Sequence, residues 1–259
     1  MVILFLGDIV GKPGRDAVVS CLPSLKADYR SDMVIANAEN AAGGWGITPP
    51  IARQLLGAGV DVITLGNHTW AKTDGFDVID AEPRILRPAN YPPGSPGRGC
   101  GLFKASCGVT VGVANLNGRI FMEPLDDPFR MAESIIDCIA HAAKVIIFDF
   151  HAETTSEKQA FGWHCDGKVS AVIGTHTHVP TADERVLPGG AAYITDAGMC
   201  GPENSVIGRE VETAISRFTT QMPHKFRVAE GKTIVCGVAI DIDEETGKAR
   251  SIERFCRRD

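Results

Sequence analysis

Four short polar motifs each follow an apolar run that is typical of a buried strand. They are Gly7–Asp8, Glu39–Asn40, Gly66–His68 and Gly174–His178. Because the carboxyl ends of strands in an open α/β sheet share one crevice, these motifs are expected to converge on one site. Oxygen and imidazole ligands without clustered thiolates suit hard or borderline divalent cations. The motifs therefore predict a metal-dependent hydrolase.

The motif at residues 174–178, Gly-Thr-His-Thr-His, carries the strongest signal. The spacing of His176 and His178 lets both rings reach one pair of cations from a strand end. A lone histidine is more often structural, whereas paired histidines at a glycine turn favour metal ligation. His151 directly follows an apolar run at residues 145–150 and adds a ligand from a further strand.

The other three motifs are weaker when each is taken alone. Asp8 could simply be a turn or helix-capping residue, and Glu39 could simply be exposed. Asn67 and His68 are more specific, because a turn after a strand needs only the glycine. Since all of these residues fall in register across five predicted strands, the functional interpretation is favoured over the structural one.

The elements that would position these residues alternate between strands and helices. Apolar runs predict strands at 2–6, 32–36, 60–65, 145–150 and 169–173, and helices at 15–25, 50–58, 74–80, 128–143 and 156–164. Pro23 should end or kink the first helix. Hairpins are expected at 102–115 and 185–194, a long irregular loop at 83–101, and a final strand pair at 233–242 and 248–255.

Parallel pairing early in the chain and antiparallel pairing late in the chain predict two mixed sheets. The expected architecture is an α/β sandwich with helices on both outer faces, built as a single domain over residues 1–259. No internal repeat, low-complexity tract or linker interrupts the chain.

Composition narrows the class of protein. With 259 residues, 44% hydrophobic and 22% charged, the chain fits a globular enzyme. A formal net charge of -6 argues against a long nucleic-acid groove, because phosphate backbones require many basic contacts. The N-terminal residues lack a basic region before the apolar run, and no run is long enough to span a membrane, so a cytoplasmic location without membrane attachment is expected.

Several other kinds of site are excluded by spacing. The eight cysteines form no C-x-x-C pair, which argues against a zinc finger and favours reduced thiols. Residues 7–12 match neither the Walker A nor the dinucleotide-binding glycine pattern. His151-Ala-Glu153 lacks the following P-C-x-x-C of a zinc deaminase, and no G-x-S-x-G is present.

Taken together, the motifs resemble those of the calcineurin-like metallophosphoesterases, and in particular the bacterial YmdB-like branch. The matching stretches are GDIVGKPGR (7–15), NAENAAGG (37–44), TLGNHTW (64–70), FMEPLDDPFR (121–130), DFHAETTSEK (149–158), GTHTHVPTADERVL (174–187), TDAGMCGP (195–202) and MPHKFRVAEG (222–231). Unlike most of the superfamily, the chain has Val10 in place of a histidine and Glu39 in place of a bridging aspartate. The YmdB-like branch shares both departures.

The resemblance implies two metal ions with Glu39 as the bridging ligand. One ion would be held by Asp8, Glu39, Asn40 and His178, and the other by Glu39, Asn67, His151 and His176. This ligand set suits iron or manganese, with zinc as an alternative. Two cations about 3.5–4 Å apart can hold a shared hydroxide and the phosphoryl oxygens. His68 would then protonate the departing alkoxide, or alternatively would orient Asn67.

The resemblance implies a small nucleotide phosphodiester as substrate, with 2′,3′-cyclic nucleotides favoured over 3′,5′-cyclic ones. RNA would fit only as a short or terminal substrate, and a homo-oligomer remains open. The motifs do not separate a phosphodiesterase from a phosphomonoesterase, or from a metal-dependent regulatory protein that binds nucleotide or RNA with little turnover. Trp45 and Trp70 could stack a base or simply pack. Lys12 and Arg15 could neutralise substrate charge or lie on the surface.

Overall fold

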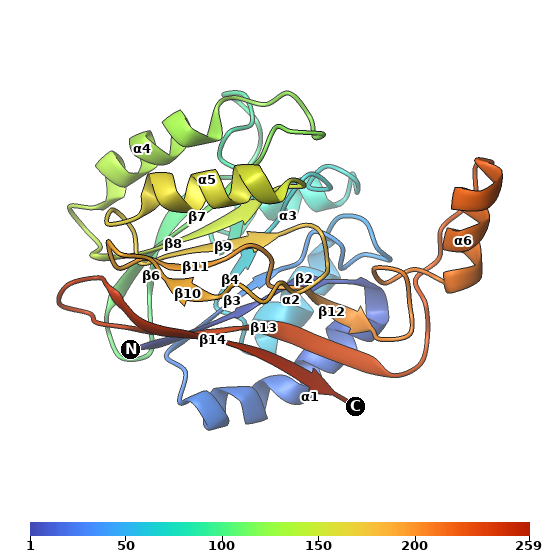
Figure 1. Cartoon of the computed structure of the whole chain (residues 1–259), viewed down its shortest axis with the longest axis horizontal. Helices are drawn as coiled ribbons and strands as arrows, with labels where there is room; N and C mark the ends of the chain where they lie inside the picture. Colours follow the sequence, from blue (N-terminus) through green and yellow to red (C-terminus); the bar gives the residue numbers. More distant parts are fainter.

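Two mixed β-sheets stack face to face, and helices cover both outer faces (Figure 1). The computed structural model describes residues 1–259. The first sheet contains β1 (Val2–Leu6), β2 (Asp8–Ile9), β3 (Met33–Asn37), β4 (Val62–Thr64), β5 (Ile85–Leu86), β12 (Met199–Pro202), β13 (Thr233–Ile242) and β14 (Ala249–Arg258). The second contains β6 (Cys100–Lys104), β7 (Thr110–Asn117), β8 (Val145–His151), β9 (Ala171–Thr175), β10 (Arg185–Val186) and β11 (Ala192–Ile194). The helices are α1 (Gly11–Tyr29), α2 (Pro49–Gly57), α3 (Gly75–Ala81), α4 (Pro128–Ile139), α5 (Thr155–Cys165) and α6 (Val211–Thr220).

Parallel strands form the centre of each sheet. In the first sheet, β1, β3, β4 and β5 run parallel, and β13 pairs antiparallel with β1. In the second, β7, β8, β9 and β11 run parallel, with β6 and β10 as antiparallel edges. Both sheets can therefore contribute residues at the carboxyl ends of parallel strands to one site, as the positions of the motifs require.

The fold has four layers, which are the two sheets and the helices on each outer face. Three hydrophobic cores lie between these layers. Along β1, Ile3 and Phe5 face the second sheet, while Leu4 and Leu6 face the helical side that includes α1. Because successive side chains of a strand point to opposite faces, one apolar run supplies two cores at once. The same alternation along β8 divides its residues between the core under α4 and α5 and the core between the sheets. The expected two-sheet α/β sandwich is confirmed.

The helix α1 does not end at Pro23 but continues to Tyr29, so the prediction that this proline could end the first helix is wrong. Pro23 lies on the exposed side of the helix, where water can reach the carbonyl group that it leaves without a partner. Leu22 and Leu25 on the opposite side are fully buried, and this packing holds the helix past the proline. The helix ends at Arg30, whose left-handed conformation is a common C-terminal cap.

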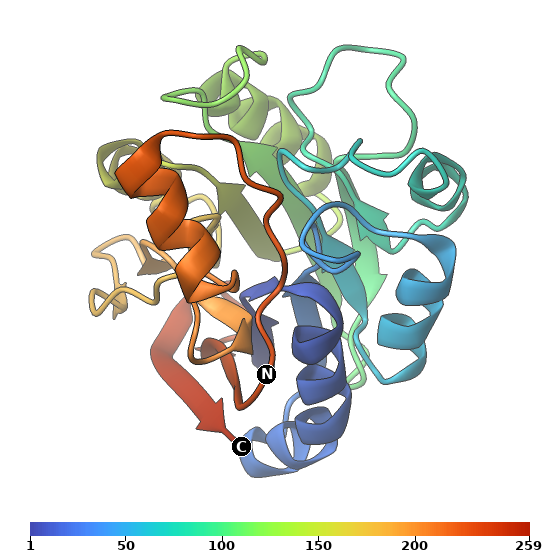
Figure 2. The same cartoon turned by 90° about the vertical axis from the view of Figure 1, so that its right-hand side faces the viewer.

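Four elements were not expected from the sequence. The two-residue strand β2 pairs with β12, and β12 pairs in turn with β13. The helix α6 stands apart from the body of the molecule in Figure 1, and it lies in front of the other elements when this side faces the viewer in Figure 2. The predicted loop at 83–101 also contains the short strand β5.

None of the helices combines the length and the apolar character that crossing a membrane would require. All eight cysteines are free.

Candidate metal centre

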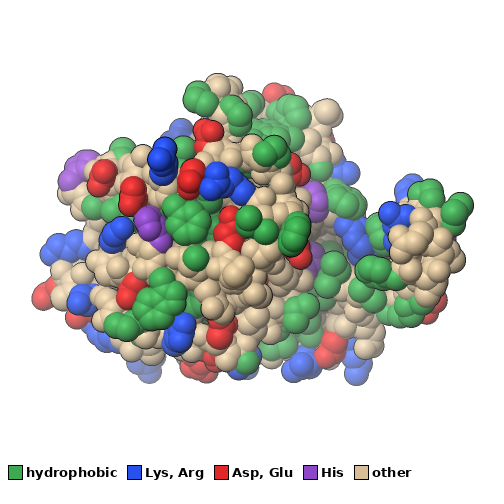
Figure 3. Space-filling view, turned by 45° about the horizontal axis from the view of Figure 1, so that its top comes forward, with side chains coloured by type: hydrophobic (Ala, Val, Ile, Leu, Met, Phe, Trp, Pro, Cys, Tyr) green, Lys and Arg blue, Asp and Glu red, His purple; other side chains and the backbone are tan.

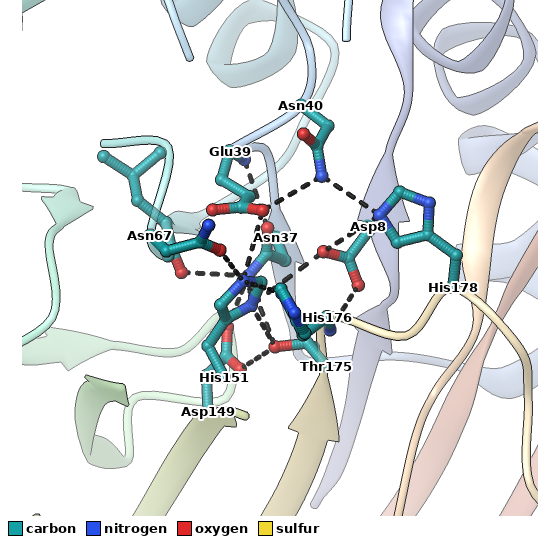
Figure 4. Close-up of polar contacts among 12 residues, drawn as sticks. Asp8, Asn37, Glu39, Asn40, Asn67, Asp149, His151, Thr175, His176 and His178 are labelled. Atoms are coloured by element: carbon teal, nitrogen blue, oxygen red, sulfur yellow. Dashed lines mark hydrogen bonds and ion pairs between the residues drawn. The ribbon is translucent and has the colours of Figure 1, made fainter. Parts of the chain in front are cut away.

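Strand ends from both sheets bring the predicted ligands into one crevice (Figure 4). Asp8 comes directly after β1 and Gly7, while the other residues follow or terminate β3, β4, β8 and β9. The residues brought together are Asp8, Glu39, Asn40, Asn67, His151, His176 and His178. Asp8, Glu39 and His151 are fully buried.

One half of the cluster is centred on Nε2 of His151. This atom lies 3.1 Å from Glu39 Oε1, 3.0 Å from Asn67 Oδ1 and 3.0 Å from His176 Nδ1. Glu39, His151 and His176 each offer one atom, and these atoms lie within 4.8 Å of one another. Carboxylate, carboxamide and imidazole groups at this spacing can share a divalent cation.

The other half joins the same Glu39 carboxylate to Asp8, Asn40 and His178. Asn40 Nδ2 lies 3.0 Å from Glu39 Oε1 and 3.1 Å from His178 Nε2. His178 Nε2 is in turn 3.8 Å from Asp8 Oδ1. This Asp8 oxygen is buried and has no hydrogen-bond partner. Because a buried carboxylate oxygen without a partner is costly, a bound cation fits this position.

The carboxylates control the protonation of the neighbouring histidines. Burial disfavours the imidazolium form of His151, but Glu39 and Asp8 outweigh this effect and raise its pKa to about 9. Burial also opposes ionisation of Glu39, yet His151 and His68 hold the pKa of this carboxyl group well below its usual range. Burial and the neighbouring His151 lower the pKa of His176 to about 3.

A buried hydrogen-bond chain fixes the orientation of His151. The hydroxyl group of Thr175 donates to Asp149 Oδ1 at 2.6 Å, so its oxygen can accept from His151 Nδ1 at 2.9 Å. Asn37 and Thr64 also donate to Asp149, and all of these groups are fully buried. These hydrogen bonds place a proton on Nδ1 of His151 and direct its Nε2 atom into the cluster. Histidines that bind metals are usually oriented in this way.

The two histidines after β9 are oriented by groups outside the cluster. His178 Nδ1 donates to the carbonyl oxygen of Ile207 at 2.9 Å, which leaves Nε2 free to act as a ligand. His176 Nε2 lies 2.9 Å from Glu153 Oε2, which leaves Nδ1 free. Six non-glycine residues have a positive φ, and three of them are His176 (103°), His178 (67°) and Ile207 (49°). Backbone strain is therefore concentrated where the ligands are positioned.

His68 lies beside the cluster of predicted ligands and lines the cavity that opens from it. Its backbone N–H donates to Glu39 Oε2 at 2.9 Å, and its Nδ1 lies 2.9 Å from Asn40 Oδ1. The side chain is 22% exposed, and the ring of Trp45 packs against it with centroids 4.4 Å apart. A partly exposed imidazole next to a metal site can exchange protons with a bound molecule and with solvent.

A cavity of about 220 Å³ opens from this cluster. Figure 3 shows histidine and basic side chains across a hollow beside the projecting α6 segment. The lining residues are Glu39, Asn40, His68, Glu153, His176, Thr177, His178, Ile207 and Arg209. The space can admit a small molecule up to the ligand atoms.

Three of the other candidates lie away from the cluster. Trp70 packs edge-on against Phe76 and Tyr91, with centroids 5.3 and 5.6 Å away, as a packing residue would. Lys12 pairs with Asp16 on the exposed surface of α1, and Arg15 donates to the carbonyl oxygen of Ala41.

The residues that orient the ligands were not identified from the sequence. Asn37, Thr64 and Asp149 are polar residues within otherwise apolar strands, and buried polar groups need partners. The contrast between these polar residues and their apolar neighbours could have identified them as candidates for a role at the site. Arg209 and the carbonyl oxygen of Ile207 had no such signal, because the segment that carries them has no regular hydrophobic pattern.

Comparisons with known proteins show the family to which the chain belongs. The family described as YmdB-like protein matches residues 4–255. A relative from Bacillus subtilis (strain 168), named 2′,3′-cyclic-nucleotide 2′-phosphodiesterase, is 53% identical over 259 residues, which cover 100% of this chain and 98% of the relative.

Solved structures show the same similarity in three dimensions. A hypothetical protein from Thermus thermophilus has a TM-score of 0.94 at 42% identity, with 100% of both chains covered. A phosphatase from Mycoplasma pneumoniae has a TM-score of 0.94 at 37% identity, with 100% of this chain and 93% of that chain covered. Because the match extends along nearly the whole sequence and the whole fold, the chain belongs to the family of YmdB-like proteins.

Proposed function

We propose that this protein is a phosphodiesterase that uses two metal ions and hydrolyses 2′,3′-cyclic nucleotides. The observation that carries the proposal is the convergence of seven potential ligand residues in one crevice, including Asp8 with its buried, unpartnered oxygen. The B. subtilis relative, at 53% identity, bears the name of this activity. 3′,5′-Cyclic nucleotides are the alternative substrates in this proposal.

In this proposal Glu39 would be shared by the two ions, because its carboxylate contacts both halves of the cluster. Asp8, Asn40 and His178 would complete one ligand set, whereas Asn67, His151 and His176 would complete the other. Iron or manganese suits these ligands, and zinc is the alternative. When bound, the two ions would neutralise the carboxylates, polarise the phosphoryl group and lower the pKa of coordinated water.

The residues of the chain perform the remaining tasks. In the structure, Asn40 directs its Nδ2 group towards His178 and its oxygen towards His68. A carboxamide can turn by 180° and exchange these two atoms. That turn would present the oxygen as a ligand and an N–H group to His68 Nδ1. His68 would then carry its proton on Nε2 and could donate it to the departing ribose oxygen as the P–O bond to that oxygen breaks. The attacking water would become bonded to phosphorus and release one proton to solvent, from which His68 would be protonated again.

The test is hydrolysis of 2′,3′-cyclic AMP by the metal-loaded protein, with the products separated by chromatography. Opening of the ring to adenosine 3′-monophosphate, with slower release of phosphate from p-nitrophenyl phosphate, supports the proposal. Preferential hydrolysis of the monoester would support a phosphomonoesterase instead. Full metal content without turnover of either ester would support the regulatory alternative.

Replacing Gly66 with alanine is expected to reduce metal binding by about 100-fold or more while the chain still folds. An added Cβ atom would overlap with Glu39 Oε2 and with His151 Nε2, so both side chains would have to move. Displacement of ligands by even about 1 Å is enough to weaken such a site strongly. Metal content after dialysis against Mn²⁺ provides the measurement. Gly57→Ala is the matched control, because its Cβ meets nothing within 4 Å. Normal metal content in the Gly66 variant would contradict the assignment of these ligands.

Replacing Thr175 with valine is expected to lower metal affinity about 10- to 100-fold. The substitution keeps the shape of the side chain but removes the hydroxyl group between Asp149 and His151. Thr175→Ser restores the hydroxyl group and should restore most of the affinity. Competition with a fluorescent chelator measures the difference. Equal affinities for the two variants would mean that the hydroxyl group does not orient His151.

A further inference from the structure

Arg209 is a cation without an anionic partner on the wall of the metal-site cavity. Its side chain forms no ion pair and donates no hydrogen bond within the chain, and its Nη1 atom is buried. The acidic groups that line the cavity are already engaged, since Glu39 contacts His151 and Glu153 contacts His176. An anion that pairs with Arg209 must therefore come from outside the chain.

Aromatic rings hold the guanidinium group in place. Its central carbon lies 4.4 Å from the ring centroid of Trp45 and 5.0 Å from that of Phe226. Burial lowers the pKa of Arg209, although an arginine remains charged at neutral pH. Stacking on aromatic faces fixes the plane of the group while leaving its N–H donors free for a ligand. Because one face of Trp45 is covered in this way, that face is not open to a nucleobase.

A tight turn fixes the backbone of Arg209 relative to the ligand cluster. Val206 and Arg209 exchange two backbone hydrogen bonds of 2.9 and 3.0 Å. Between them, Ile207 adopts a positive φ of 49° and accepts the hydrogen bond from His178 Nδ1. One short segment thus orients a predicted metal ligand and carries the unpaired cation to the same cavity.

We propose that Arg209 binds the phosphoryl group of the substrate and so acts beside the metal ions. This inference rests on the proposed function, since it assigns a partner to the substrate of that same site. A guanidinium group presents several N–H donors in one plane and matches two phosphoryl oxygens better than a lysine does. Occupation of the site would also supply the anion that the buried cation lacks in the free protein.

The test uses inorganic phosphate as the probe and the metal-loaded protein as it is purified. Phosphate affinity is measured by calorimetry for wild type, Arg209→Met and Arg209→Lys, and metal content and melting temperature are measured on the same samples. Methionine keeps an unbranched side chain between the two rings but removes the charge. Arg227→Ala is the control, because Arg227 is exposed and lines a different cavity.

We expect the methionine variant to bind phosphate about 10- to 100-fold more weakly, with lysine in between and the control unchanged. Metal content should remain normal, and the melting temperature should stay the same or rise, because a half-buried cation without an anionic partner has been removed. Unchanged phosphate affinity in the methionine variant would overturn the inference. A lower melting temperature with lost metal, and with normal phosphate affinity in the loaded fraction, would also overturn it by assigning Arg209 a structural role only.

Phosphate binding and diester hydrolysis are separate readouts. If wild type hydrolyses no cyclic nucleotide but the Arg209 variants still lose phosphate affinity, the proposed function fails and the anion site stands. If wild type hydrolyses 2′,3′-cyclic AMP and the variants match it in phosphate affinity and Michaelis constant, the proposed function stands and the role of Arg209 fails.

Discussion

Replacing Glu39 with glutamine is expected to abolish the binding of both metal ions and to reduce turnover at least about 10³-fold. The Glu39 carboxylate contacts potential ligand atoms in both halves of the cluster, at 3.1 Å from His151 Nε2 on one side and 3.0 Å from Asn40 Nδ2 on the other. Glutamine has the same shape but no charge to hold two cations together. Loss of metal removes several kcal/mol of transition-state stabilisation, which corresponds to a rate factor of this size.

The measurement is metal content together with hydrolysis of 2′,3′-cyclic AMP. Glu212→Gln on α6 removes an equal charge from an exposed position and should behave as wild type. A Glu39→Gln protein that retains two equivalents of metal and near-normal turnover would show that Glu39 does not bridge the ions.

Replacing His68 with alanine is expected to lower turnover about 10²- to 10⁴-fold while metal content stays normal. His68 contacts Asn40, a proposed ligand, through Nδ1, but is not itself one of the proposed ligands. Its loss should therefore remove a proton donor and leave the ligand set intact.

Two substrates with different leaving groups distinguish whether His68 acts as a general acid or only orients its neighbours. A p-nitrophenolate group departs without protonation, so bis-p-nitrophenyl phosphate should be much less sensitive to His68→Ala than 2′,3′-cyclic AMP. An equal loss on both substrates, or a parallel loss of metal, would instead assign His68 to the orientation of its neighbours.

Much of the architecture could be predicted because the strands at the centre of the sheets are buried on both faces. The runs that became β1 and β8 are mainly apolar, so the positions of these strands, and of Asp8 and His151 near their carboxyl ends, could be predicted. The predicted ligands meet in space because they all occupy such strand ends. The strand β13 lies at the predicted residues, since it is both long and apolar.

The parts that could not be predicted depend on tertiary contacts. The strand β2 has only two residues and exists through its pairing with β12. The segment from β12 to β13 has no apolar period, so neither the turn at Ile207 nor Arg209 could be placed beside His178 in advance. The helix α1 continues past Pro23, because packing on one side of the helix outweighed the tendency of proline to interrupt helices.

The central claim is that two metal ions, held by this one cluster, are required for hydrolysis of a phosphodiester. Titrating metal-free protein with Mn²⁺ while following 2′,3′-cyclic AMP hydrolysis tests it most directly. We expect two equivalents bound per chain, turnover that appears only as the second site fills, and loss of both on treatment with a chelator. Full turnover in metal-free protein, or with a single equivalent, would contradict it.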